Sequence, residues 1–202
     1  MPKIDFKNAL KVLYQPSPAI PVVVIVPQMK FVMIDGMGDP YTSQGYQEGV
    51  EALQEVAYTI RAMLREQDYD FEVMPLECLL WVEDSEFSIE KKDQFSWTSM
   101  IMQPDRVTED IFNKAVVTVT EMKNPIAIEK VRLESFHEGK SVQILHIGPP
   151  NTTQASIEKI HAHAKKFGYL LHGKYHEIYL SDPARTEPSK IKTVIRHPVR
   201  KK

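Results

Sequence analysis

The chain has 202 residues, 43% hydrophobic and 26% charged, a composition typical of a globular protein with one sizeable core. Its formal net charge of −2 gives no electrostatic reason to bind nucleic acid directly, because such binding rests on neutralising phosphates. One cysteine excludes an intrachain disulfide, and neither a secretory signal nor a membrane-length apolar run is present, so we expect a cytoplasmic protein that does not insert into membranes.

The first part of the chain is predicted to contain a leader and one folded module. Residues 1–30 are expected to be extended, because prolines at 16, 18, 21 and 27 disfavour helix, with a strand over residues 22–26. A strand over residues 31–35, a Gly-Pro turn and a helix capped by Thr42 or Ser43 follow. Strands over residues 68–84 and 95–102 then complete a first module, residues 31–104.

The rest of the chain is predicted to repeat this order of elements. Residues 105–130 form a connection whose helix Thr108 caps. The second module, residues 131–202, begins with a hairpin of residues 131–137 and 142–147 around Glu138-Gly139-Lys140. A Gly-Pro turn, a helix that ends at Gly168, and strands over residues 171–182 and 190–199 follow.

The repeated order predicts one α+β domain. Two strand-helix-strand-strand modules would form an antiparallel sheet, with a pseudo-two-fold cleft on the sheet faces that the helices leave bare. Such a cleft is a usual place for a small-molecule ligand.

One strand carries the most informative side chains. Residues two apart on a strand share a face, so Tyr175, Glu177 and Tyr179 point the same way. In the aligned first module Trp81 stands opposite Tyr179, and Leu79 occupies the place of Glu177. With Trp97 as a further wall, this pattern predicts an aromatic cleft around one carboxylate.

Other interpretations of these residues stay open. Alternating Tyr and Glu also occur on solvent-facing strands. His161 and His163 lie two apart on a helix and face different ways, and the remaining histidines lack a matching ligand set, so no metal is predicted. Gly36-Met-Gly38 lacks a third glycine, and no cofactor is predicted. Cys78 is expected to be an inert core residue.

The chain resembles the GyrI-like small-molecule-binding proteins. The matching segments extend through nearly the whole sequence, namely Leu13-Tyr-Gln-Pro16, Val26-Pro27, Phe31 to Pro40, Pro75 to Trp81, His146 to Pro149, Lys166 to Tyr169, His176 to Pro183 and Lys192 to Arg196. Two positions differ from what the subfamily often shows: Tyr41 replaces Asn, and Tyr175 replaces His.

This resemblance implies a duplicated module whose cleft takes lipophilic, often cationic, compounds, with Glu177 as the acid at the cleft floor. It also implies similarity to free-standing members that hydrolyse the cyclopropane ring of DNA-alkylating compounds within an aromatic cage. Trp81, Trp97 and Tyr179 are the expected cage, and Glu177 is the expected acid–base group.

Two other functions remain. The protein could bind its ligand without turnover, as a drug-sequestering protein or as an inhibitor that docks on another protein, in the manner of a gyrase inhibitor. It could also sense ligands for transcription, but the proline-rich first 30 residues cannot form a helix-turn-helix. The sequence identifies neither the physiological ligand nor the oligomeric state.

Overall fold

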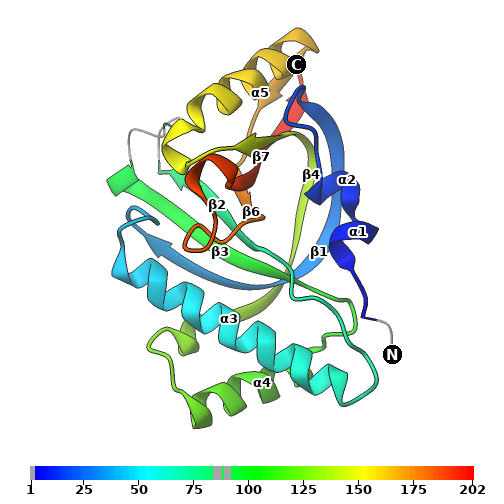
Figure 1. Ribbon diagram of the computed structural model, residues 1–202, viewed down its shortest axis with the longest axis vertical. Coiled ribbons are helices and arrows are strands. Elements are labelled where there is room, and N and C mark those ends of the chain that lie inside the picture. The colour runs from blue at the N-terminus through cyan, green and yellow to red at the C-terminus, as the bar shows by residue number, and fades with distance from the viewer. Residues whose placement is uncertain (1–2, 84–87, 89–91) are drawn as a thin grey trace.

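The fold is a small antiparallel barrel flanked by helices (Figure 1), seen in a computed structural model that describes residues 3–83, 88 and 92–202. Its strands are β1 (Val22–Met37), β2 (Leu76–Val82), β3 (Phe95–Gln103), β4 (Arg132–Ile147), β5 (Tyr169–Leu171), β6 (Tyr175–Tyr179) and β7 (Lys192–Lys201). They are ordered β4-β1-β3-β2-β6-β7-β5, and β4 also pairs with β7. This last pairing closes six strands into a barrel, which leaves fewer free sheet edges.

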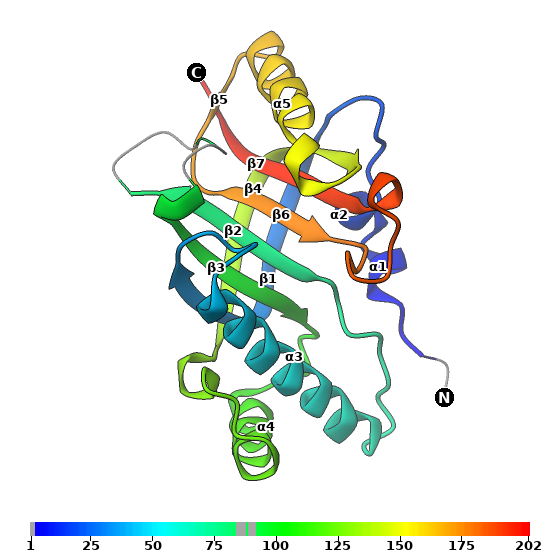
Figure 2. The same ribbon diagram turned by 60° about the vertical axis from the view of Figure 1, so that its left-hand side comes forward.

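The helices lie at three places around the barrel. They are α1 (Phe6–Ala9), α2 (Lys11–Tyr14), α3 (Gln44–Arg65), α4 (Glu109–Met122) and α5 (Gln154–Lys166), with short 3-10 turns at Lys92–Gln94, Ile128–Lys130, Pro150–Thr152 and Pro188–Lys190. Figures 1 and 2 show α3 and α4 together at one end, α5 at the opposite end, and α1 and α2 beside β1. Among the described residues no helix is long and apolar enough to cross a membrane.

Local chemistry sets the helix ends as the sequence predicts. The Ser43 hydroxyl accepts the Tyr46 amide at 3.4 Å, and the Thr108 hydroxyl accepts the Ile111 amide at 3.3 Å. Gly168 follows α5 with a φ of 72°, which a side chain would disfavour. The buried stripe of α3 consists of Gly49, Ala52, Leu53, Val56, Ala57, Ile60 and Leu64.

The predicted α+β class and module order are confirmed. The first module is β1-α3-β2-β3, and the second is β4-α5-β6-β7, with the short β5 added beside β7. The domain boundaries proposed from the sequence stay a prediction, although β1 runs across the one at residue 30.

Three predicted elements were wrong in extent. In place of the predicted hairpin, Arg132–Ile147 form one continuous strand, because Gly139, with a φ of 76°, bends β4 without reversing it. The leader contains α1, α2 and the first part of β1, since the prolines at 16, 18, 21 and 27 all lie after α2. The strand expected over residues 68–84 is only Leu76–Val82, and Asp84 lies outside the described residues.

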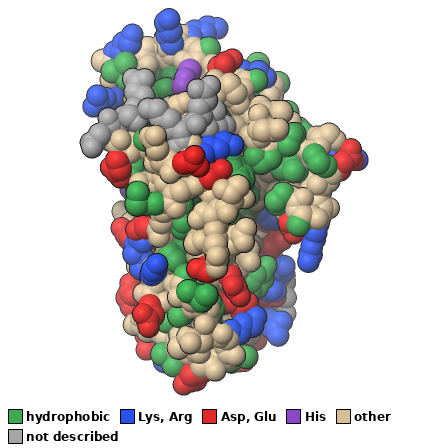
Figure 3. Space-filling model, turned by 90° about the vertical axis from the view of Figure 1, so that its left-hand side faces the viewer, with side chains coloured by type: hydrophobic (Ala, Val, Ile, Leu, Met, Phe, Trp, Pro, Cys, Tyr) green, Lys and Arg blue, Asp and Glu red, His purple; other side chains and the backbone are tan. Residues whose placement is uncertain are grey.

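The sheet has two distinct faces, and this decides where the site lies. The outer face, here called the helix face, packs on α3: a Cβ added at Gly49 would lie 3.4–3.5 Å from the Ile34 and Trp97 side chains. The inner face, here called the barrel interior, brings side chains of β2, β4, β6 and β7 into contact across the barrel. Figure 3 shows acidic and basic side chains intermixed over much of one side of the molecule, with basic residues gathered at the end near α5.

Candidate ligand-binding site

A buried carboxylate surrounded by tyrosines lies on the helix face. Glu177 is opposite Cys78 in the β2–β6 pairing, so both side chains point to this face. Glu177 is only 2% exposed. Its Oε1 accepts the Tyr175 hydroxyl at 3.0 Å, and its Oε2 accepts the hydroxyls of Tyr41 and Tyr179, each at 3.0 Å. We call Glu177 and these three residues the tyrosine cluster.

The cluster is assembled from both modules. Tyr175 and Tyr179 flank Glu177 on β6, whereas Tyr41 comes from the turn between β1 and α3. The Tyr41 residue is 40% exposed while its hydroxyl reaches the buried carboxylate. Tyr41 therefore covers the cluster from the solvent side, with the Lys92 ammonium 5.1 Å from its ring centroid.

The electrostatics of the cluster favour neutral hydroxyls around one acceptor. Burial, followed by the negative charge of Glu177, raises the pKa of Tyr41 and of Tyr175. Burial and the neighbouring Tyr46 raise the pKa of Tyr179 as well. The tyrosines thus remain hydrogen-bond donors at neutral pH.

Within the described part of the chain Glu177 forms no ion pair with a lysine, arginine or histidine. A buried carboxylate without a counter-cation is costly, so this site favours a ligand that brings positive charge or a proton.

Cys78 lies beside the cluster, in surroundings that disfavour its thiolate. Its thiol is fully buried, and the Ser99 hydroxyl lies 3.8 Å from its Sγ. Burial, together with the charge of Glu177, raises the pKa of this thiol to about 12. Since the thiolate is the reactive form, the sequence-based expectation of an inert cysteine agrees with this environment.

Trp97 lies on the same face as Glu177, next to α3. Its ring centroid is 5.0 Å from that of Tyr46, in an edge-to-face contact. The indole occupies the space that a side chain at position 36 would fill, because a Cβ on Gly36 would lie 2.1 Å from it. Its Nε1 is buried without a hydrogen-bond partner among the described residues. Trp97 is therefore a wall of the helix face near the cluster.

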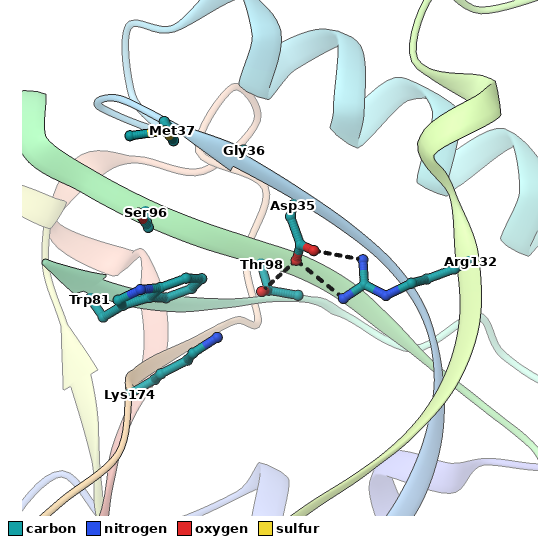
Figure 4. A pocket seen from close by; sticks show the side chains of 8 residues that line it. All are labelled: Asp35, Gly36, Met37, Trp81, Ser96, Thr98, Arg132 and Lys174. Atoms are coloured by element: carbon teal, nitrogen blue, oxygen red, sulfur yellow. Dashed lines mark hydrogen bonds and ion pairs between the residues drawn. The ribbon is translucent and has the colours of Figure 1, made fainter. Parts of the chain in front are cut away.

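Trp81 and Leu79 lie on the other face, so the prediction that they share a cleft with Glu177 was wrong. Leu79 pairs with His176, whose side chain points into the barrel interior. Trp81 lines a separate pocket at one mouth of the barrel (Figure 4). Both faces of β2 carry mainly apolar side chains, so alternation within this strand could not show which face meets Glu177.

The barrel interior also holds a buried ionic network. His176 lies 3.0 Å from Glu77 and 3.1 Å from Glu138, and the Arg196 guanidinium lies 2.9 Å from Glu138. Tyr14 donates to Glu77 at 2.7 Å, and Arg196 donates to the Leu13 carbonyl at 2.9 Å. This network attaches α2 to the barrel.

Sequence reasoning missed Tyr41 and Tyr46 as members of this region. Tyr46 interacts with the hydroxyls of Ser99 and Tyr179, and burial raises its pKa. In the sequence, the spacing of Tyr46 from Val50 and Leu53 indicates only the apolar face of a helix. Tyr41 stood in a turn, and its departure from the common Asn was the one signal that could have drawn attention to it.

Comparisons with known proteins agree with this architecture. The GyrI-like small molecule binding domain matches residues 21–200. An uncharacterized conserved protein from Listeria innocua is 37% identical, with a TM-score of 0.92 over 98% of this chain and 100% of its own. A Listeria innocua protein described as a hydrolase is 36% identical, with a TM-score of 0.89 over the same shares.

More distant matches support the fold alone. The EcmrR C-terminal domain is 13% identical, with a TM-score of 0.60 over 90% of this chain and 98% of its own. The comparison with curated proteins gives no match.

Proposed function

Because the chain belongs to the GyrI-like small-molecule-binding family, we propose that it binds lipophilic aromatic xenobiotics at the tyrosine cluster and hydrolyses those that carry a strained, electrophilic ring. The observation that carries this proposal is the environment of Glu177. Its buried carboxylate accepts hydrogen bonds from three tyrosine hydroxyls, and none of the described residues forms an ion pair with it. The hydrolase description of the Listeria innocua relative supports the catalytic part.

Binding follows from the chemistry of the cluster. A planar compound can stack on tyrosine rings, and a cationic one gains cation–π attraction of about 0.5–2 kcal/mol at each ring. The Glu177 carboxylate adds the counter-charge that a buried cation needs. Entry requires Tyr41 to turn aside, because its hydroxyl otherwise occupies the Glu177 Oε2.

Hydrolysis would use Glu177 as the base. The carboxylate accepts a proton from a water molecule, whose oxygen forms a bond to the methylene carbon of a cyclopropane fused to a dienone. The cyclopropane C–C bond breaks, and its electrons pass to the dienone oxygen. A tyrosine hydroxyl stabilises that oxygen and hands it a proton, which the protonated Glu177 then replaces. The net change is the addition of one water.

The binding part is tested with proflavine, a planar aromatic cation. We expect Glu177→Gln to weaken its affinity by about tenfold or more, since hydrogen bonds and contacts to charged groups are worth about 1.5–3 kcal/mol. Glu158→Gln, on the exposed side of α5, is the matched control and should bind as the wild type does. Equal proflavine affinity in all three proteins would refute the ligand site, provided that a thermal melting curve shows each protein to be folded.

The catalytic part is tested by incubation with a cyclopropane-fused dienone and mass spectrometry. We expect a product heavier by one water with the wild type and Glu158→Gln, and none above background with Glu177→Gln. Tight uptake without product in the wild type would identify a sequestering protein instead.

A further inference from the structure

The barrel interior opens at one mouth into a pocket that is separate from the tyrosine cluster. Its volume is about 360 Å³, and its lining consists of Asp35, Gly36, Met37, Trp81, Ser96, Thr98, Arg132 and Lys174. Trp81 and Glu177 point to opposite faces of the paired strands β2 and β6, so a ligand in one site cannot touch the other. Figure 4 shows Trp81 and Lys174 on one side of this space and the Asp35–Arg132 pair on the other.

Most of the charge in this pocket is already compensated. The Arg132 guanidinium lies 2.9 Å from Asp35, and its Nε donates to Glu134 at 2.7 Å. The Thr98 hydroxyl donates to Asp35 at 2.7 Å. These contacts fix Asp35 and Arg132 against each other and leave neither available as the main anchor for an ion.

Lys174 is the exception. Its ammonium lies 3.3 Å from the centroid of the Trp81 ring, and no carboxylate of the described residues forms an ion pair with it. Partial burial lowers the pKa of Lys174, and this effect outweighs the nearby Asp35 and Glu83 carboxylates, which raise it. An indole face attracts a cation without neutralising it, so this ammonium can still receive an anion.

A hydrogen bond holds the Trp81 indole in position under the Lys174 ammonium. Trp81 Nε1 donates to Glu83 at 2.6 Å, which fixes the ring plane beneath Lys174. Met37 and the Gly36 backbone supply apolar surface at the same mouth, and Ser96 supplies a hydroxyl there. The pocket thus combines one cation that forms no ion pair with a described residue, one hydroxyl and flat apolar walls.

We propose that this barrel-mouth pocket is a second binding site, selective for small aromatic monocarboxylates. The ligand carboxylate contacts the Lys174 ammonium and the Ser96 hydroxyl, and its ring lies against Trp81 and Met37. Its charge preference is opposite to that of the tyrosine cluster, where Glu177 favours cations.

The test is isothermal titration calorimetry with 1-naphthoate, and with 1-naphthylmethylammonium as the probe of reversed charge. The wild type should bind naphthoate saturably, and the ammonium probe should not compete for the same site. Lys174→Gln should weaken naphthoate binding about tenfold or more, as expected for loss of a charge-assisted contact. Lys140→Gln is the matched control, because Lys140 also lies over an aromatic ring, 5.5 Å from the Tyr169 centroid, far from the pocket.

The location is read independently from the protein labelled with ¹⁵N-tryptophan. The chain has two tryptophans, so it gives two indole signals, which Trp81→Phe assigns. Naphthoate should shift the Trp81 signal and leave that of Trp97 in place, and saturating proflavine should not displace it. No saturable binding, equal loss in Lys174→Gln and Lys140→Gln, or a shift of Trp97 alone would each overturn the proposal, without bearing on the proflavine site.

Discussion

At the scale of single residues, the tyrosine cluster depends on hydrogen bonds to one carboxylate that is withdrawn from water. Each tyrosine hydroxyl replaces part of the hydration that Glu177 loses on folding. Removing one donor leaves an acceptor partly unsatisfied, which costs more than a typical hydrogen bond contributes.

Tyr175→Phe tests this directly, because Tyr175 is buried and its hydroxyl donates to Glu177 Oε1. We expect the free energy of unfolding in urea to fall by about 1–3 kcal/mol. Tyr58→Phe is the control, since Tyr58 is 56% exposed, and it should change stability by less than about 0.5 kcal/mol. Equal stability of the two variants would show that Glu177 does not need this donor.

In the sequence Gly36 belongs to a predicted turn, whereas in the structure its missing side chain makes room for the Trp97 ring. A Cβ there would lie 2.1 Å from the Trp97 ring, so Gly36→Ala should push the indole aside. We expect a changed near-ultraviolet circular dichroism signal and a destabilisation of about 1–3 kcal/mol, as for other overpacked cores. Gly45→Ala, whose Cβ would meet nothing closer than 3.7 Å, should preserve the tryptophan signal.

At the scale of elements, the ionic network that holds α2 makes stability depend on pH. Burial disfavours the charged form of His176, but Glu138 and Glu77 outweigh it and raise the His176 pKa above its ordinary value of 6.5. His176 therefore stabilises the fold fully below pH 6.5, and this contribution is lost as the pH rises through the folded-state pKa.

His197 should contribute with the opposite sign. Burial and the neighbouring His161 lower its pKa to about 4, so the folded protein loses stability as the pH falls from 6.5 toward 4. Urea denaturation from about pH 4 to well above pH 6.5 should show that His176→Gln flattens the alkaline decline in stability and that His197→Gln flattens the acidic one. His137→Gln, at an exposed position, should leave both limbs in place. A parallel curve for His176→Gln would show that the network is not protonated.

The extent of each element was predictable only where local chemistry fixes it. Ser43 and Thr108 marked two helix starts, and Gly168 marked a helix end. Gly139 misled, because the same residue type permits both a reversal and a bend, and only pairing with β1 and β7 decides between them. The faces of β2 could not be assigned either. Cross-strand register depends on the neighbouring strands, and the sequence of a mainly apolar strand does not indicate it.

At the scale of the whole molecule, the strand pairings of the barrel join the two modules. The β4–β7 pairing lies within the second module, whereas β1–β4 and β2–β6 link the second module to the first. The sequence repeat predicted two modules and the tyrosine pair on β6, yet the cluster needed Tyr41 from the other module. A site that draws on two modules requires them to be held together, and the barrel does this.

The modules should therefore unfold as one unit. Both tryptophans lie in the first module, whereas Ile195 lies on β7 and is fully buried. Ile195→Ala should destabilise the protein by about 2–5 kcal/mol, with the transition seen by tryptophan fluorescence shifted as far as that seen by far-ultraviolet circular dichroism. Ile20→Ala, at a side chain 66% exposed, should shift neither. If the fluorescence transition kept its wild-type midpoint, the first module would be stable without the second, and the barrel would not couple them.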